Sequence, residues 1–69
     1  MNAIRWAMAL DGWHTGRIGA EKVAEARELP DGVWWRAGVG DWHRAPTLEA
    51  AIREATKAVE RGSLRAVPL

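Results

Sequence analysis

The stretch Leu29-Pro30-Asp31-Gly32-Val33-Trp34-Trp35-Arg36-Ala37 decides the fold of this chain. Proline presets φ for a turn, aspartate caps it, and Gly32 accepts a left-handed backbone, so residues 30–32 predict a tight turn. The residues after the turn are β-branched or aromatic and predict a strand. We therefore expect a hairpin that pairs 22–28 with 33–38. Intrinsic propensity favours a helix over 20–28, and this alternative stays open.

Toward the N-terminus, large apolar residues at every second position from Ile4 to Leu10 predict a half-buried strand over 4–10. Asp11-Gly12 then predicts a two-residue hairpin turn, because glycine adopts a positive φ at no steric cost. Residues 13–18 form the expected returning strand, although Gly16 weakens it.

Toward the C-terminus, residues 42–45 predict a short strand that Pro46 ends, and Thr47 is a suitable N-cap for a helix. An apolar stripe at helical spacing follows, formed by Leu48, Ala51, Ile52, Ala55 and Val59. Gly62 is expected to end this helix, leaving residues 63–69 as a loose tail. The predicted fold class is α+β: one compact domain over 1–62, with a small antiparallel sheet of three to four strands packed on one C-terminal amphipathic helix.

Composition narrows the function. The 69 residues include five Trp, no Phe, no Tyr and no Cys, and the net charge is +1. Disulfides and thiolate metal sites are therefore excluded. No segment has the basic excess typical of nucleic-acid binders, so a nucleic-acid partner is the less expected one. The sequence also shows no apolar run of roughly 20 residues and no signal-peptide core. We expect a cytoplasmic protein with no membrane partner and, from the leading Met, a complete small reading frame.

Catalysis and metal binding are not expected. The hydroxyl side chains are few, namely Thr15, Thr47, Thr56 and Ser63. Of these, Thr47 is expected to cap the helix, Thr56 to lie on it and Ser63 to lie in the tail. Two Trp-His pairs, each close to an Asp, offer a conceivable two-His, two-carboxylate metal site, formed by Asp11, His14, Asp41 and His43. Nothing in the sequence brings these four together, so we expect neither a metal nor another cofactor.

The tryptophans predict a binding surface. Neighbouring residues of a strand point to opposite faces, so one of Trp34 and Trp35 faces the helix and the other faces away from it. The second ring either lies exposed as an interface or is covered by the N-terminal hairpin or a second copy. Trp42-His43-Arg44 has the composition of an interface hot spot. The expected partner-binding residues are Trp13, Trp34, Trp35, Arg36, Trp42, His43 and Arg44. Two alternatives stay open: the Trp rings stack on nucleic-acid bases, with Arg17 and Arg36 on phosphates, or a second copy buries them in a structural homo-oligomer.

Three pieces of the segment 23–60 carry a family resemblance: Pro30-Asp31-Gly32-Val33-Trp34, Gly40, and Thr47-Leu48-Glu49-Ala50-Ala51-Ile52. With them the segment resembles the core of HicB-type antitoxins and related small partner-binding domains. Two features depart from that pattern. The second glutamate of the family's helix motif is Ala50 here, and Gly38-Val39-Gly40-Asp41-Trp42 replaces a Pro-Gly-Cys-like stretch.

The resemblance implies a sheet-and-helix domain that binds another protein. Small size and the lack of a catalytic set are also typical of anti-CRISPR inhibitors. We therefore expect a non-enzymatic inhibitor encoded by a phage or mobile element, which occludes the surface of a bacterial defence or toxin component. Homodimerisation is a further possibility, since a chain this small has little core of its own.

Overall fold

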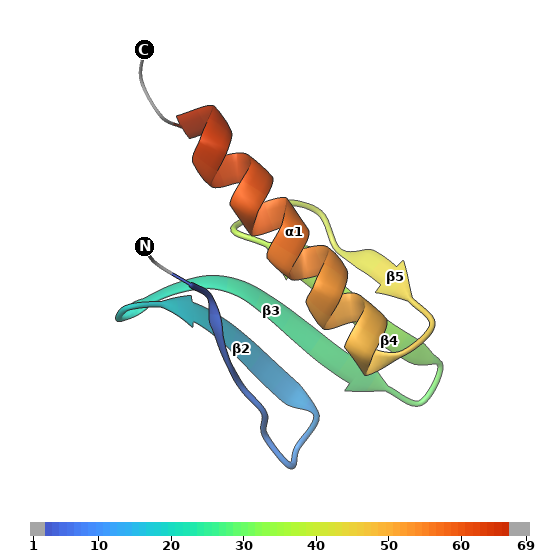
Figure 1. Ribbon diagram of the computed structural model, residues 1–69. Coiled ribbons are helices and arrows are strands. Elements are labelled where there is room, and N and C mark those ends of the chain that lie inside the picture. The colour runs from blue at the N-terminus through green and yellow to red at the C-terminus, as the bar shows by residue number, and fades with distance from the viewer. Residues whose placement is uncertain (1–2, 67–69) are drawn as a thin grey trace.

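The computed structural model describes residues 3–66 as a five-stranded antiparallel sheet with one helix across it (Figure 1). In chain order the elements are β1 (Arg5–Ala7), β2 (Trp13–Ile18), β3 (Glu21–Leu29), β4 (Gly32–Ala37), β5 (His43–Ala45) and α1 (Leu48–Ala66). The sheet order is β1-β2-β3-β4-β5, so each strand pairs with the one before it in the sequence. The predicted α+β class is confirmed, with five strands where three to four were expected.

The hairpin predicted around residues 30–32 is confirmed. Leu29 pairs with Gly32 and Glu28 with Val33, and Gly32 has a positive φ of 149°. The segment 20–28 is therefore a strand rather than the alternative helix. Tertiary structure overrides its helical propensity. Strand β3 lies between β2 and β4, so both of its edges are hydrogen-bonded, and its residues Ala24 and Ala26 pack under α1.

The first hairpin differs from the prediction. Strand β1 ends at Ala7, and residues 8–12 form a longer loop in place of a two-residue turn. A two-residue Asp-Gly turn needs a left-handed backbone at both positions, but only Gly12 has one, with φ 85°. The Asp11 carboxylate instead accepts the N–H of Trp13 at 3.0 Å, and the Ala9 N–H donates to Nδ1 of His14 at 3.0 Å.

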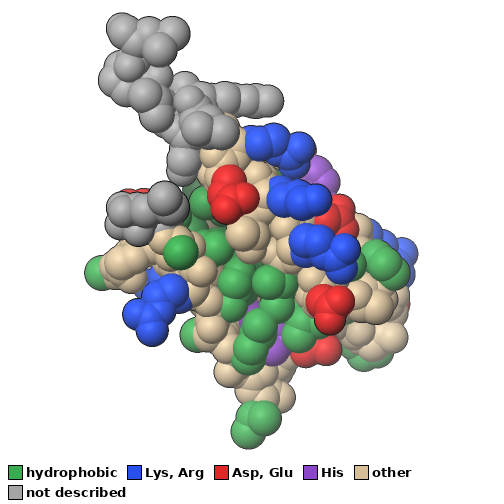
Figure 2. All heavy atoms as spheres, viewed as in Figure 1, with side chains coloured by type: hydrophobic (Ala, Val, Ile, Leu, Met, Phe, Trp, Pro, Cys, Tyr) green, Lys and Arg blue, Asp and Glu red, His purple; other side chains and the backbone are tan. Residues whose placement is uncertain are grey.

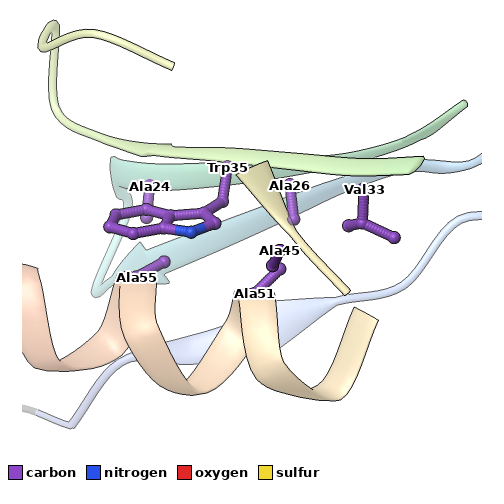
Figure 3. Packing of buried hydrophobic residues seen from close by; sticks show 7 residues of the cluster. All are labelled: Ala24, Ala26, Val33, Trp35, Ala45, Ala51 and Ala55. Atoms are coloured by element: carbon purple, nitrogen blue, oxygen red, sulfur yellow. The ribbon is translucent and has the colours of Figure 1, made fainter. Parts of the chain in front are cut away.

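The core lies between the sheet and α1. Trp35 of β4 points toward the helix, and its indole lies between Ala24 of β3 and Ala55 of α1 (Figure 3). Ala51 and Ala55, one helical turn apart, are completely buried. Because these side chains are small, the helix approaches the sheet closely, and one large indole fills much of the space between them.

Strand β1 reaches the helix through one side chain. The indole Nε1 of Trp6 donates to Oγ1 of Thr56 at 3.1 Å, which links residues 50 positions apart. Trp6 lies opposite Gly16 of β2, where a Cβ atom would come within 2.8 Å of the Ile4 side chain and 3.1 Å of the Trp6 ring. The sequence predicts that Gly16 weakens its strand, but its lack of a side chain also provides the space that the Trp6 indole occupies.

The start of α1 is as predicted, and its end is not. Thr47 Oγ1 accepts the N–H of Ala50 at 3.1 Å, so Thr47 is the N-cap. The helix continues through Gly62, which has no positive φ, and ends at Ala66. One glycine inside a helix costs only about 1 kcal/mol, which the helix-forming residues around it offset. The expected loose tail is thus helical over 63–66, and residues 67–69 lie outside the described residues. Nowhere in residues 3–66 does a helix combine the length and the apolar character that a membrane crossing requires.

Candidate binding site on the open face of the sheet

One face of the sheet carries α1; on the other, which we name the open face, no element of residues 3–66 is packed. Ala26 and Trp35 point toward α1, so the alternate residues of their strands point away from it. Residues paired across strands share a face, and the register therefore places three rows of side chains on the open face. The rows are Trp13–Arg27–Trp34–Arg44, Ala7–Thr15–Glu25–Arg36 and Arg5–Arg17–Lys22.

A guanidinium group lies above the ring of each tryptophan on this face. The distances from the Arg Cζ atom to the ring centroid are 4.6 Å for Arg27 and Trp13, 4.8 Å for Arg36 and Trp42, and 5.4 Å for Arg44 and Trp34. Such cation–π contacts fix the flat faces of both groups. The open face is therefore a layer of planar side chains that lie against one another.

Two of these rings meet over the middle of the face. The centroids of Trp13 and Trp42 are 6.3 Å apart, in an edge-to-face arrangement with an interplanar angle of 69°. Trp13 belongs to β2 and Trp42 directly precedes β5, and three inter-strand spacings separate these strands by about 14 Å. The rings must therefore lean toward one another across β3 and β4, which makes a continuous aromatic centre.

A buried carboxylate lies under this layer. Glu25 of β3 is 1% exposed, although α1 lies on the other side of the sheet. Its Oε2 atom is 3.1 Å from Nε of Arg36 and 3.2 Å from Nζ of Lys22. Its Oε1 atom is buried and has no hydrogen-bond partner. The side chains of the open face itself therefore cover Glu25, and they satisfy only one of its two oxygens.

The open face is strongly basic. Six of the ten Lys and Arg residues of the chain lie on it, namely Arg5, Arg17, Lys22, Arg27, Arg36 and Arg44. Among the residues of the three rows, Glu25 is the only acidic one, and it is covered. The view onto α1 shows basic and acidic side chains interspersed instead (Figure 2). The net charge of +1 thus combines a basic open face with acidic side chains that lie elsewhere in the chain.

The structure divides the seven predicted partner-binding residues between the two faces. The open face brings together Trp13, Trp34, Arg36, Trp42 and Arg44. Trp35 is a core residue, 8% exposed, and His43 stacks on its ring at a centroid distance of 4.6 Å. These two therefore do not belong to the open face.

Sequence reasoning missed Arg27 and Glu25 as members of this site. Both lie on the segment 20–28, where the choice between strand and helix was left open, and a helix would have placed them differently. Once that segment is a strand paired to residues 32–37, its alternation puts both side chains on the face of Trp34 and Arg36. The alternation of residues along this segment could have identified both side chains, but only after the segment was known to be a strand.

The conceivable metal site does not form. His14 is 3% exposed; its Nδ1 accepts the N–H of Ala9, and its Nε2 lies 2.8 Å from Oε1 of Glu28. Since Nδ1 accepts a hydrogen bond, Nε2 carries the proton and donates to the carboxylate. Residues 3–66 contain no group of three or more His, Cys, Asp or Glu side chains arranged to hold a metal ion.

Chemically, the open face offers aromatic planes, guanidinium planes and positive charge on a broad surface. A shallow hollow of about 350 Å³ adjoins it beside Arg44, whose guanidinium donates to the backbone oxygen of Asp31. No family model, curated protein or solved structure matches this chain. The resemblance of residues 23–60 to HicB-type antitoxins stays a prediction.

Proposed function

We propose that this chain is a non-enzymatic binding protein that holds single-stranded nucleic acid on its open face. One observation carries the proposal: three tryptophans and six basic residues share that face with one covered carboxylate. A groove or face that combines positive charge with aromatic rings is the general solution for binding unpaired strands. The alternative that the sequence made less expected is thus the better supported one.

In this proposal the tryptophan rings stack on bases, and the neighbouring arginines pair with phosphates. Trp13 and Trp34 belong to one row and are two strands apart, about 10 Å, and the bases of an unpaired strand can splay to reach both. Base stacking on an aromatic ring contributes about 1–3 kcal/mol per base. The arginines between the rings are placed to pair with phosphates, and each guanidinium also offers a plane on which a base can stack.

A protein partner is the second candidate, favoured by the composition of the aromatic centre. Trp and Arg are the residues most enriched in interface hot spots. In this version Trp13 and Trp42 fill a pocket on an acidic partner, the arginines fix the register, and the protein acts as the inhibitor expected from the sequence, of the antitoxin or anti-CRISPR kind. The same face acts in both versions, but the dependence on salt differs.

The test measures the affinity for fluorescent single strands of DNA and RNA and for a duplex of equal length. Three to four phosphate contacts predict a roughly 20- to 50-fold loss of affinity for a single strand between about 50 and 200 mM salt. The double variant Arg27→Ala, Arg44→Ala is expected to weaken binding and flatten the salt dependence by about one contact per residue. Lys57→Ala, Arg61→Ala removes the same charge from α1 and is the matched control.

Three results contradict the proposal. The first is no binding of any single strand at low salt, and the second is tighter binding of the duplex. The third is equal weakening by the two double variants, because charge alone then explains the affinity. Sedimentation of the free protein distinguishes a further outcome: self-association that the open-face double variant abolishes assigns the face to a second copy.

A further inference from the structure

We infer that Glu25 gives the open face a preference for cytosine over thymine and uracil, by accepting a hydrogen bond from the cytosine amino group on its free oxygen. The inference rests on the proposed function and deepens it, since it names the base that the site selects. It starts from the one feature of the open face that stacking and charge leave unexplained: a negative group at the centre of a surface for a polyanion.

Holding Arg36 and Lys22 in place does not require both carboxylate oxygens of Glu25. The Oε2 atom makes both ion pairs, at 3.1 Å and 3.2 Å, while Oε1 is buried without a partner. A buried acceptor that lacks a hydrogen bond destabilises a protein, so its presence asks for an explanation. An ionised carboxylate only accepts hydrogen bonds, so the missing partner must be a donor.

The two rings of the aromatic centre are placed to admit that donor. Arg36 contacts both Trp42 and the Glu25 carboxylate, so the ring and the carboxylate are close neighbours. A base between two parallel rings needs about 7 Å, twice the 3.4 Å stacking distance of bases. The centroids of Trp13 and Trp42 are already 6.3 Å apart, so a rotation of one ring and a small separation open the slot. A base inserted from solvent then points its edge down toward Glu25.

Pyrimidine edges differ at the position that meets this oxygen. Cytosine presents its N4 amino group, which is the donor that Glu and Asp accept from. Thymine presents the O4 carbonyl there, and uracil has the same carbonyl, so two acceptor oxygens would face each other and the base is repelled. The rings are otherwise alike in size and stacking area, so the difference lies in this one contact.

The experiment compares oligonucleotides of about eight nucleotides, within the usual range of site sizes. For the wild-type protein we expect oligo-dC to bind about tenfold tighter than oligo-dT, and oligo-C to exceed oligo-U similarly. Glu25→Gln keeps the shape but offers a donor as well as an acceptor, so we expect the two affinities to come within about twofold. Glu54→Gln, on the exposed side of α1, is the matched control and keeps the tenfold ratio.

A second measurement leaves the protein unchanged. Oligonucleotides in which 2-pyrimidinone replaces cytosine lack both the amino group and the O4 carbonyl, and we expect the wild-type protein to bind them more weakly than oligo-dC and at least as tightly as oligo-dT. Equal binding of dC, dT and the pyrimidinone strand overturns the role of Glu25 while the proposed function stands. Failure of every oligonucleotide to bind overturns the proposed function itself.

Discussion

Replacement of Arg36 by methionine tests how the open face tolerates a buried carboxylate. Methionine keeps much of the apolar stem, so the change removes mainly the charge and the hydrogen bond to Oε2 of Glu25. In the wild-type background the carboxylate is then left with Lys22 alone, whose side chain is 47% exposed. In a Glu25→Gln background the same substitution leaves no buried charge behind.

The expected magnitudes follow from the burial of the two partners. Removing one partner of a buried ion pair costs about 3–5 kcal/mol. Arg36 is 32% exposed and Lys22 remains, so we expect Arg36→Met to lower the free energy of unfolding by only about 2–3 kcal/mol. A domain of this size has roughly 3–10 kcal/mol in total, and each 1 kcal/mol lowers Tm by about 4–8 °C. In the Glu25→Gln background the contact with Trp42 and a hydrogen bond to the neutral amide are lost, which together cost about 1–2 kcal/mol.

Urea unfolding followed by far-ultraviolet circular dichroism measures both costs. Tryptophan fluorescence is unsuitable here, because the Arg36 guanidinium lies on the ring of Trp42 and its removal changes the signal directly. Arg53→Met is the control, since it breaks an ion pair with Glu49 that is exposed on both sides and is expected to cost about 0.3–0.5 kcal/mol. Equal costs of Arg36→Met in the two backgrounds would refute the coupling between Arg36 and the buried carboxylate.

Three further substitutions test the packing, each by chemical denaturation. Gly16→Ala is expected to destabilise by about 1–3 kcal/mol, because its Cβ would collide with Ile4 and Trp6; an unchanged or raised stability contradicts the close approach at this position. Gly62→Ala is expected to stabilise by about 0.5–1 kcal/mol, since this position is helical and open space surrounds the added methyl group; a loss of stability would mean that the helix ends there. Thr56→Val removes the acceptor of the Trp6 indole and is expected to cost about 1–2 kcal/mol, and the absence of any cost would show that water satisfies the indole equally well.

Most of the fold could be predicted from local signals. The turn at residues 30–32, the N-cap at Thr47 and the alanine stripe of α1 are short-range patterns, and the structure follows each of them. The wrong predictions lie where a small energy difference or the conformation of a single residue decides the structure. Helix α1 continues past Gly62 because the neighbouring residues offset the free energy that a glycine costs inside a helix. The first hairpin has a longer loop because Asp11 does not adopt the left-handed backbone that a two-residue turn needs.

The candidate site was harder to predict, because its residues are neighbours only across strands. Alternation alone indicated that Trp34 and Trp35 lie on opposite faces of the sheet, and this is correct: Trp35 is buried under α1 and Trp34 is half-buried on the open face. Charge counted along the chain could not show the basic face, since Glu28 lies beside Arg27 in sequence but points to His14 on the other side of the sheet. Only the register shows which charges share a surface.

The sequential order of the strands also determines how this protein folds and which strand unfolds locally first. Each strand pairs with its predecessor across a short loop, so closing the sheet costs little chain entropy and folding is expected to be fast. The packing of α1 on β3 and β4 joins more distant parts of the chain, and the contact between Trp6 and Thr56 joins positions 50 residues apart. Strand β1 is short and lies at the edge, so its amides should exchange with solvent hydrogen first, well before those of β3 and β4. Each such opening bares the edge of β2, while the pairing that carries Glu25, Arg27 and Trp34 stays closed.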